Sequence, residues 1–344
     1  MFRTLRPITR RALALGTLLL VALLGLLLPL RAAPHDVPST IASDCSRDVS
    51  RDLEQFIAEV PSGSTVRFPS GRCYRVDSTI NLPARNLRID GQGSWFREIT
   101  PAGGTSPPGA TAAIWSIEGG TGPLVLTNIK TRGINTSHAY VHNREWQHGV
   151  AVRGASNVTI DHYTSLEVGG DGVAIEGDAR GNPAHNVRVT KASIRHAGRQ
   201  GVFAGNVDGL RVEHAYIDAT GYGVGVDIEP DRGTDREYNI TVGPHVTVAS
   251  NRLGAVRVSG PVPGTAKAQR IFKNITVTDV TELQCPSGYA SISIRNEPGY
   301  LGDDLRVTHN RVLNNGQAIQ LRPNDWNNVD IQTRNQTKPC GSAW

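Results

Sequence analysis

Beyond residue 33 the sequence has no second apolar run long enough to span a bilayer, and it has no surplus of charge of either sign. The whole chain carries 36 lysine and arginine residues against 31 aspartate and glutamate residues. Five of those arginines, and no acid, lie within residues 1–33, so the remaining 31 basic residues balance the 31 acids. The part of the chain after residue 33, called the body below, therefore has no net charge. It lacks the excess of positive charge that binds phosphate groups, so we expect no nucleic-acid partner.

Cysteine is scarce, with four residues, and no two of them form a C-x-x-C pair. That absence argues against a zinc site or a redox motif, and we expect neither a metal nor a cofactor. Four cysteines allow three pairings. We expect sequence neighbours to pair, Cys45 with Cys73 and Cys285 with Cys340, because two disulfides would then hold the two ends of the fold.

Residues 1–33 have the composition of an export signal. The basic stretch MFRTLRPITRR precedes the 19-residue apolar run ALALGTLLLVALLGLLLPL, and the small-residue stretch RAAPHD follows. We expect cleavage near Ala33. The alternative is an uncleaved membrane anchor at residues 12–30, because the run approaches the length that spans a bilayer. Both interpretations place the body in an oxidising compartment, and we expect a secreted, extracellular protein.

The body contains an internal repeat with the pattern N-[VIL]-x-[VI]. The matches and two variants begin at Asn86, Asn157, Asn186, Gly209, Asn239, Asn274, Asp304 and Asn328. From Asn157 onward the spacings are 29, 23, 30, 35, 30 and 24 residues. These spacings are too short for a β-α-β unit with a full helix, and no helical periodicity lies between the matches.

A second column of apolar tetrads accompanies the first. It reads GVAV, GVAI, GVFA, GVDI, AVRV, SISI and AIQL, beginning at Gly149, Gly172, Gly201, Gly225, Ala255, Ser291 and Ala318. We therefore expect two short strands per repeat, in a chain that winds in coils and stacks each strand on its own copy. Asparagine and glycine suit the corners because they tolerate a left-handed backbone. A sandwich of hairpins would instead need an Asn-Gly turn between successive strands, but the sequence has a single Asn-Gly pair, at residues 315–316.

This double pattern resembles the right-handed parallel β-helix of the pectate-lyase-like superfamily, over roughly residues 50–336. The fold class implied is all-β, a single-stranded solenoid. The stretch LEQFIAEVPSGSTVRFPSGRCYRVDSTINL resembles the amphipathic helix and first strand with which that superfamily caps its open end. We expect residues 34–85 to form this cap and the first coil, residues 86–336 the β-helix, and residues 337–344 a tail.

Stacking the second column in register would produce two ladders of outward residues on coils about 4.8 Å apart. In the stretch GVGVDIEPD, residues 223–231, Asp227 and Glu229 alternate with Val226 and Ile228 and so share this outward face. The first ladder reads Ala151, Ala174, Phe203, Asp227, Arg257, Ser293, Gln320, and the second reads Arg153, Glu176, Gly205, Glu229, Ser259, Arg295, Arg322. We expect this face to be exposed.

Gly205 leaves a gap in the second ladder between Glu176 and Glu229. Their backbones, two coils apart, would lie roughly 10 Å from each other. Inverting glycosidases hold two carboxyls roughly 6.5–9.5 Å apart to leave room for a water, and the lean of the side chains could bring this pair into range.

A third row, His148, Asp171 and Gln200, precedes these strands. The segments WQHGVAV, GGDGVAIEG and GRQGVFAG resemble the Asn-Thr-Asp, Gly-Asp-Asp and Gly-His-Gly coils of polygalacturonases. Asp171 matches the second acid of the pair, but Gly170 replaces the first. His148 takes the place of another acid, and Gln200 lies near the position of the histidine. Only one of the acids that this resemblance implies is therefore present.

We expect a polysaccharide-active enzyme, most simply a monomeric glycoside hydrolase with an extracellular polysaccharide, and no protein, as its partner. The predicted catalytic acids are Asp227, Glu229, Asp171 and Glu176. The residues predicted to contact the sugar are Arg199, Gln200, His148, Arg257, Phe203, Trp146 and Tyr222.

Two alternatives stay open at this point. A lyase or uronate C5-epimerase would need a base at C5 and a cation at the substrate carboxylate, roles that His148, Arg199, Arg257 or a calcium ion held by the acids could fill. A non-catalytic adhesin or glycan-binding module would need no chemistry from these residues.

Overall fold

The computed structural model describes residues 33–99, 113–218, 220–249, 251–260, 269–286, 289–295, 300–314, 318–321, 326–331 and 334–344. The predicted export signal, apart from Ala33, and Arg322 of the second ladder therefore lie outside the described residues. Within the described residues, no helix has both the length and the apolar composition to cross a membrane.

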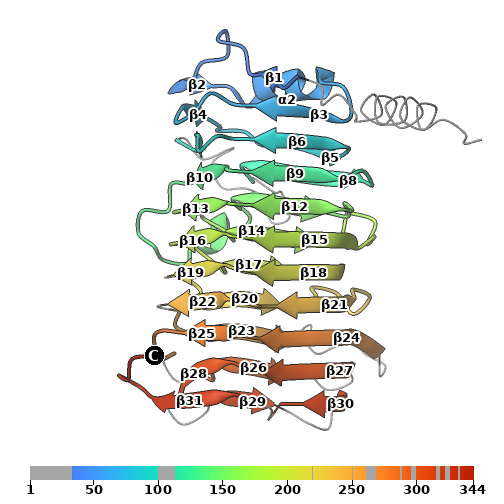
Figure 1. Cartoon of the computed structure of the whole chain (residues 1–344), viewed down its shortest axis with the longest axis vertical. Helices are drawn as coiled ribbons and strands as arrows, with labels where there is room; N and C mark the ends of the chain where they lie inside the picture. The colour runs from blue at the N-terminus through green and yellow to red at the C-terminus, as the bar shows by residue number, and fades with distance from the viewer. Residues whose placement is uncertain are drawn as a thin grey trace, which may run out of the picture. The chain divides into compact units, whose positions relative to one another are not determined.

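The body, Pro34–Trp344, is a stack of coils built from three parallel sheets (Figure 1). The first sheet contains β1 (His35–Asp36), β3 (Ser64–Arg67), β6 (Leu87–Asp90), β9 (Leu124–Thr127), β12 (Val158–Asp161), β15 (Ala184–Thr190), β18 (Val207–Glu213), β21 (Glu237–Val242), β24 (Gln269–Thr278), β27 (Tyr300–Thr308) and β30 (Trp326–Asp330). The second contains β2 (Asp44–Asp48), β4 (Cys73–Arg75), β7 (Trp95–Arg97), β10 (Lys130–Arg132), β13 (Thr164–Leu166), β16 (Ser193–Arg195), β19 (Tyr216–Asp218), β22 (Val246–Ala249), β25 (Val280–Glu282), β28 (Arg311–Asn314) and β31 (Gln336–Pro339). The third contains β5 (Ile80–Ala84), β8 (Trp115–Gly120), β11 (Val150–Arg153), β14 (Val173–Glu176), β17 (Val202–Ala204), β20 (Val224–Ile228), β23 (Gly254–Ser259), β26 (Ile292–Arg295) and β29 (Ile319–Leu321).

The all-β parallel solenoid expected from the repeat is confirmed, but the expectation of two strands per repeat is wrong. Each complete coil has three strands, and the second sheet supplies the strand that the sequence pattern did not reveal. Several strands of that sheet, such as β16 and β19, have three residues with one fully buried centre, Ile194 or Ile217. A single apolar residue between polar neighbours is too short to produce a recognisable period of two.

The third sheet has the predicted register. Its first outward ladder pairs Ala151, Ala174, Phe203, Asp227, Arg257, Ser293 and Gln320 in that order. The residues between them point inward, and those of β11, β14, β17, β20, β23 and β26 are valine, isoleucine or alanine in the buried core. A one-residue slip would move this apolar set outward, so burial fixes the register.

The asparagine corners also match the prediction. Asn157, Asn186, Asn239 and Asn274 have φ values of 60°, 51°, 56° and 54°, in the left-handed region. Their amides link successive coils: Asn186 Nδ2 donates to Asn157 Oδ1 at 3.2 Å, and Asn274 Nδ2 donates to Asn239 Oδ1 at 3.0 Å. Each corner side chain thus bonds its own copy in a neighbouring coil.

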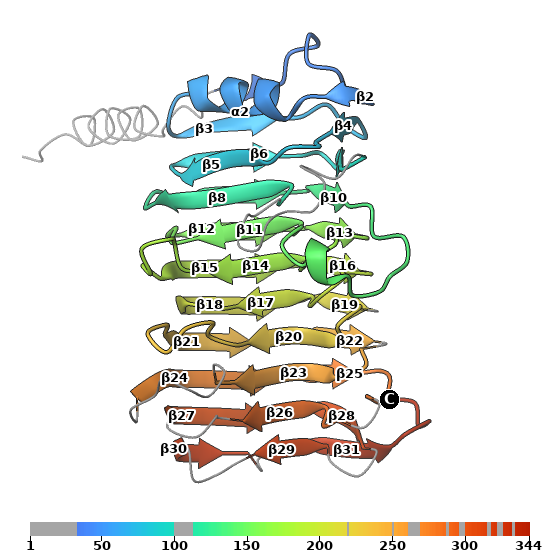
Figure 2. The same ribbon diagram turned by 180° about the vertical axis from the view of Figure 1, so that it is seen from behind.

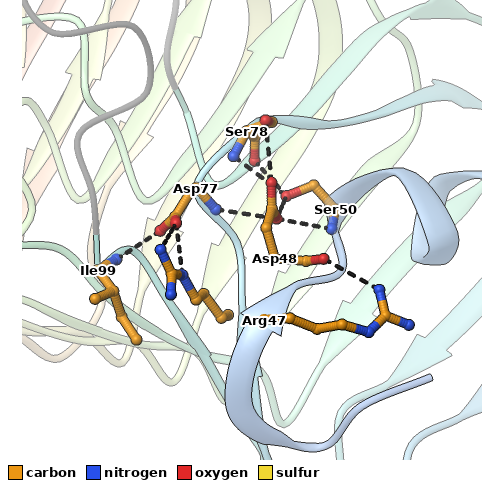
Figure 3. Close-up of polar contacts among 7 residues, drawn as sticks. Arg47, Asp48, Ser50, Asp77, Ser78 and Ile99 are labelled. Atoms are coloured by element: carbon orange, nitrogen blue, oxygen red, sulfur yellow. Dashed lines mark hydrogen bonds and ion pairs between the residues drawn. The ribbon is translucent and has the colours of Figure 1, made fainter.

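The predicted capping helix is α2 (Ser50–Glu59), which lies over the first coils at one end of the stack (Figure 2). It buries Leu53 and Ile57 in the core. Asp48 holds the start of this helix (Figure 3). Its carboxylate accepts hydrogen bonds from the Ser50 N–H at 3.0 Å and, across to the next coil, from the Asp77 N–H at 3.3 Å.

Both predicted disulfides are present. Cys45 pairs with Cys73, with a Cα–Cα distance of 5.1 Å, and Cys285 pairs with Cys340, with a Cα–Cα distance of 5.7 Å. The first joins β4 to residue 45 of β2, and the second joins the loop after β25 to the C-terminal segment. Together they fasten the first and last coils of the stack.

Candidate functional site

The segment between β10 and β11, which carries the 3-10 turn η1 (His142–Arg144), extends out beside β13 and β16 before it returns to the third sheet (Figure 2). The ring of His138 stacks on that of His196, with centroids 3.8 Å apart. The rings of Tyr140 and Tyr222 meet edge-on at 5.4 Å. These contacts dock the segment and place its end, Trp146 and His148, beside the outward face of the third sheet.

The predicted third row is a buried polar network. His148, Asp171 and Gln200 are each at most 1% exposed. The Asp171 N–H donates to Nδ1 of His148 at 3.0 Å, and Asp171 Oδ2 lies 3.2 Å from the same nitrogen. The Gln200 N–H donates to Asp171 Oδ1 at 2.9 Å. Because each residue lies just before a strand of the third sheet, coil stacking alone brings the three together.

Asp227 joins this network from the next coil. Gln200 Nε2 donates to Asp227 Oδ2 at 3.0 Å, and Arg257 Nε lies 4.0 Å from Asp227 Oδ1. Burial, followed by the neighbouring charge of Glu229, raises the pKa of the Asp227 carboxyl. The expectation that this face is exposed is wrong at its centre, because Asp227 and Phe203 are at most 1% exposed.

Arg199 covers the buried acids. Its guanidinium lies 5.7 Å from the Trp146 ring centre and 5.2 Å from that of Phe203, and its Nη1 is 3.6 Å from Asp171 Oδ2. Burial disfavours the charged form of Arg199, but the negative charges of Asp171 and Glu145 outweigh this effect and raise the pKa of Arg199. The side chain is therefore a fixed cation held between two aromatic rings.

Beside this network lies a cavity of about 240 Å³. Four acidic residues line it, Glu176, Asp178, Asp231 and Asp235. The rest of the lining consists of Trp146, Arg153, Gly177, Ala179, Gly181, Gly205, Asn206 and Arg232. A Cβ at Gly205 would lie 2.8 Å from Cε1 of Phe203 and 3.6 Å from Oδ2 of Asp231. The predicted open gap between Glu176 and Glu229 is therefore occupied by the Phe203 ring and the Asp231 carboxylate.

Asp231 is the principal residue that the sequence interpretation missed. It lies in the loop between β20 and β21, just after Pro230 ends the strand, and it remains exposed as a residue. The concave surroundings of its carboxyl, and then the nearby charge of Glu176, raise its pKa to about 7. Asp231 is the last residue of the stretch GVGVDIEPD. The alternation of side chains along a strand does not predict the direction of a side chain that lies beyond the end of the strand.

The two glutamates of the second ladder are held by arginines. Glu176 Oε2 pairs with Arg153 Nη2 at 3.0 Å, and Glu229 Oε1 accepts from Arg257 Nη2 at 3.0 Å. The second Glu176 oxygen, Oε1, is buried and has no hydrogen-bond partner among the described residues. Both ion pairs are cross-coil contacts of the kind expected for the ladder.

The predicted site residues thus fall into two groups. Asp171, His148, Gln200 and Asp227 form the buried network, with Arg199, Phe203, Arg257 and Glu229 packed around it and Tyr222 beside Arg257; Glu176 and Trp146 line the cavity. Glu145, Asp178 and Asp235 were not predicted, and each lies in a loop without a repeat pattern. Among the residues that the structure describes, no group of three or more histidine, cysteine, aspartate or glutamate side chains could hold a metal ion.

The fold is similar to that of several solved structures. The endo-xylogalacturonan hydrolase from Aspergillus tubingensis shares 14% identity over 89% of this chain and 93% of that chain, with a TM-score of 0.61. A 1,3-alpha-1,4-beta-D-galactose-4-sulfate-3,6-anhydro-D-galactose-2-sulfate 4 galactohydrolase shares 12% identity over 83% of this chain and 72% of that chain, with a TM-score of 0.54. A variant catalytic domain of a GH87 alpha-1,3-glucanase shares 13% identity over 91% of this chain and 67% of that chain, with a TM-score of 0.50.

No protein-family model and no curated protein sequence matches the chain. The structural similarities confirm the parallel β-helix fold. One fold of this kind can carry different chemistries, so identities of 12–14% concern the fold alone.

Proposed function

We propose that the chain is a glycoside hydrolase that acts on an extracellular polysaccharide in the cavity above Gly205. One observation carries the proposal: the cavity places two carboxyl groups in different environments. The concave surroundings of its carboxyl and its negative neighbours raise the pKa of Asp231, a residue that is exposed as a whole, to about 7, whereas Glu176 is paired with Arg153 at 3.0 Å. An acid that keeps its proton near neutral pH, beside a carboxylate held by a cation, is the combination that glycoside hydrolysis requires.

In this proposal Asp231 is the general acid and Glu176 the general base. Asp231 donates its proton to the glycosidic oxygen as the bond to the anomeric carbon breaks. Glu176, whose Oε2 is paired with Arg153 at 3.0 Å, takes a proton from the attacking water. Trp146 offers an aromatic face at the cavity for a sugar ring.

The buried network acts through position. His148, Asp171, Gln200 and Asp227 are at most 1% exposed, so none of them contacts a sugar in the cavity. They fix Arg199 between Trp146 and Phe203, and the Phe203 ring fills the space that a side chain at Gly205 would take. Glu229, paired with Arg257, adds negative charge near Asp231 and helps to raise its pKa.

Three similar folds support hydrolysis over the alternatives, because all three are named as glycan hydrolases. Charge within the cavity also disfavours elimination at a uronate. A lyase or epimerase needs cations at the substrate carboxylate, but four carboxylates and two arginines line this cavity. The two disulfides support the proposed extracellular location.

The test is incubation of the purified protein with a panel of polysaccharides, reading both new reducing ends and absorbance near 235 nm, where an elimination product absorbs. Reducing ends without absorbance support hydrolysis; absorbance with each cut contradicts it. Asp231→Asn and Glu176→Gln should then lose about 10²–10⁴-fold in turnover. The matched control is Glu59→Gln on α2, which removes one charge at the far end of the stack and should keep full turnover.

A further inference from the structure

Three arginines lie in register on the outward face of the second sheet. Arg75 of β4, Arg97 of β7 and Arg132 of β10 are direct partners on successive coils. Neighbouring strands are about 4.8 Å apart, and like charges directly opposite each other destabilise a sheet. A run of three guanidinium groups therefore needs negative charge close by.

The described residues supply two carboxylates, one at each end of this run. Asp77 Oδ2 lies 2.6 Å from Nη2 of the β4 arginine, and Asp77 Oδ1 accepts the Ile99 N–H at 2.8 Å (Figure 3). Glu167 Oε2 lies 2.8 Å from Nε of the β10 arginine, and Glu167 Oε1 lies 3.7 Å from His138 Nε2. The oxygens of both acids are thus occupied by groups other than Arg97.

Arg97, in the middle of the run, has no such partner. It is exposed, and no hydrogen bond or ion pair holds its guanidinium in the part of the chain that the structure describes. Glu98, the next residue, is buried. Residues 100–112, which follow in the sequence, contain no aspartate or glutamate. The middle guanidinium is therefore left for a negative group from outside the chain.

A second cation lies beside this arginine. Lys130 of β10 is the register partner of Trp95, two residues before Arg97 on β7. Its ammonium lies 5.6 Å from the centre of the Trp95 ring, which attracts a cation at this distance, and no acid pairs with it among the described residues. Strand spacing and rise place Lys130 and Arg97 roughly 8 Å apart along the diagonal, within reach of one anionic chain. We call these four cations the basic surface: Arg75, Arg97, Arg132 and Lys130.

The first sheet offers a comparison. Arg188 of β15 directly faces Arg211 of β18, but Glu213 pairs with Arg188 and the run ends after two residues. Arg211 is exposed, yet its other register partner is Thr241, and no lysine lies on either neighbouring strand, β15 or β21. Arg211 is thus a single exposed arginine without the second free cation that Arg97 has.

We infer that the basic surface binds the carboxylate or sulfate groups of an anionic polysaccharide outside the cell and holds that polymer against the second sheet. Guanidinium groups suit such oxyanions because they donate two parallel hydrogen bonds to them. A row of cations along three coils suits a chain with repeated charges better than one small ion. The body has no net charge, so it lacks the broad positive field of a nucleic-acid binder.

This surface belongs to the second sheet, whereas the cavity includes residues of the third, such as Arg153 and Glu176. The inference therefore goes beyond the proposed function and does not depend on it. The basic surface would anchor a polymer, and the cavity would cut one.

The experiment compares polymers that differ only in charge. Dextran sulfate is titrated against the purified protein by calorimetry beside unmodified dextran, and polygalacturonate beside its methyl ester, which separates sulfate from carboxylate recognition. We expect at least one charged polymer to bind, its uncharged twin not to bind, and the affinity to fall as sodium chloride is raised. No binding of either charged polymer, or tighter binding of duplex DNA than of both, would show that the inference is wrong.

Matched variants locate the binding. Arg97→Gln should weaken binding of the charged polymer about 10-fold, the loss of one hydrogen bond between charged groups, and Lys130→Gln should weaken it in the same direction. Arg211→Gln also removes an exposed arginine and should change the affinity less than twofold. Equal losses in Arg97→Gln and Arg211→Gln would contradict a specific surface.

Melting temperature checks the physical reason. Because Arg97→Gln removes a like charge from the run, the variant should melt no lower than wild type without ligand. The charged polymer should then raise the melting temperature of wild type more than that of the variant. A variant that melts lower without ligand, or the same rise in both proteins, would contradict the argument from like charges.

Turnover separates this inference from the proposed function. Arg97→Gln should keep full turnover on a short soluble oligosaccharide, whereas Asp231→Asn should lose turnover and still bind the charged polymer as wild type does. Binding of the charged polymer by a protein that cleaves no glycan would support the anchor and contradict hydrolysis. Loss of that binding in Asp231→Asn would contradict a separate anchoring surface.

Discussion

Gly205→Ala adds one methyl group to the lining of the cavity, and the distances around Gly205 set the size of its effect. The new Cβ would lie 2.8 Å and 2.9 Å from Cε1 and Cζ of Phe203. Carbon atoms in good contact are about 3.5–4.0 Å apart, so the ring must move by about 0.7 Å or more. Phe203 is 1% exposed and lies under Arg199, which leaves it little room. Overpacking of this kind costs about 1–3 kcal/mol of unfolding free energy.

The same methyl group should reduce turnover more than stability. It would lie 3.6 Å from Oδ2 of Asp231, where the reacting sugar has to approach. A misplacement of about 1 Å can lower the rate about 10²-fold. The assay is the melting temperature together with kcat/KM on the glycan that the panel identifies. Gly71→Ala is the control: its φ of 66° makes a side chain strained, but nothing lies within 4 Å, so stability should fall without loss of turnover. Unchanged turnover in a folded Gly205→Ala protein would refute the placement of the sugar.

Three further outcomes follow from the contacts. Replacing Cys285 and Cys340 by serine opens a loop with a sequence separation of 55 and should lower the unfolding free energy by about 4 kcal/mol in denaturant titrations; an unchanged midpoint contradicts this. Burial raises the folded-state pKa of Glu237, so its contribution to stability is fully present below the unfolded pKa and is lost as pH rises toward the folded value. The Glu237→Gln variant should therefore lose less stability than wild type between pH 4.5 and pH 7, by up to about 1.4 kcal/mol per pH unit, and parallel curves would show that this acid is not buried. Asp227→Asn should lower turnover about 10-fold or more while the pH dependence set by Asp231 is unchanged; a shifted pH dependence would make Asp227 the titrating acid.

The fold could be predicted because the same pattern of apolar and corner residues recurs in many coils of the sequence. Apolar residues at every second position of β11, β14, β17 and β20 have to face one core, and asparagine occupies several of the left-handed corners. Register follows from that pattern, and so does the row of His148, Asp171 and Gln200. Several strands of the second sheet, such as β16 and β19, were missed because three residues with one buried centre carry no detectable period.

The candidate site could be predicted only where strands supply its residues. The ladder predicted the pairing of Glu176 with Arg153 and the closeness of Glu229 and Arg257, but it gave no account of the loops that cover or extend it. The expected solvent-exposed strand face is buried at Asp227, because side chains from neighbouring segments cover it: Arg199, Trp146 and Phe203. Asp231 comes from a loop whose path depends on tertiary packing, and no local sequence rule describes that path.

The central claim is that Asp231 protonates the leaving group, and one comparison of substrates tests it most directly. The measurement is kcat/KM of wild type, Asp231→Asn and Glu176→Gln on the natural glycan and on an aryl glycoside of the same sugar, whose phenolate leaves without help from an acid. Asp231→Asn should lose about 10²–10⁴-fold on the glycan and little on the aryl glycoside, whereas Glu176→Gln should lose activity on both. The fall in wild-type kcat/KM above pH 7 should also disappear in Asp231→Asn. Equal losses of Asp231→Asn on the two substrates, or full activity on the glycan, would contradict the account.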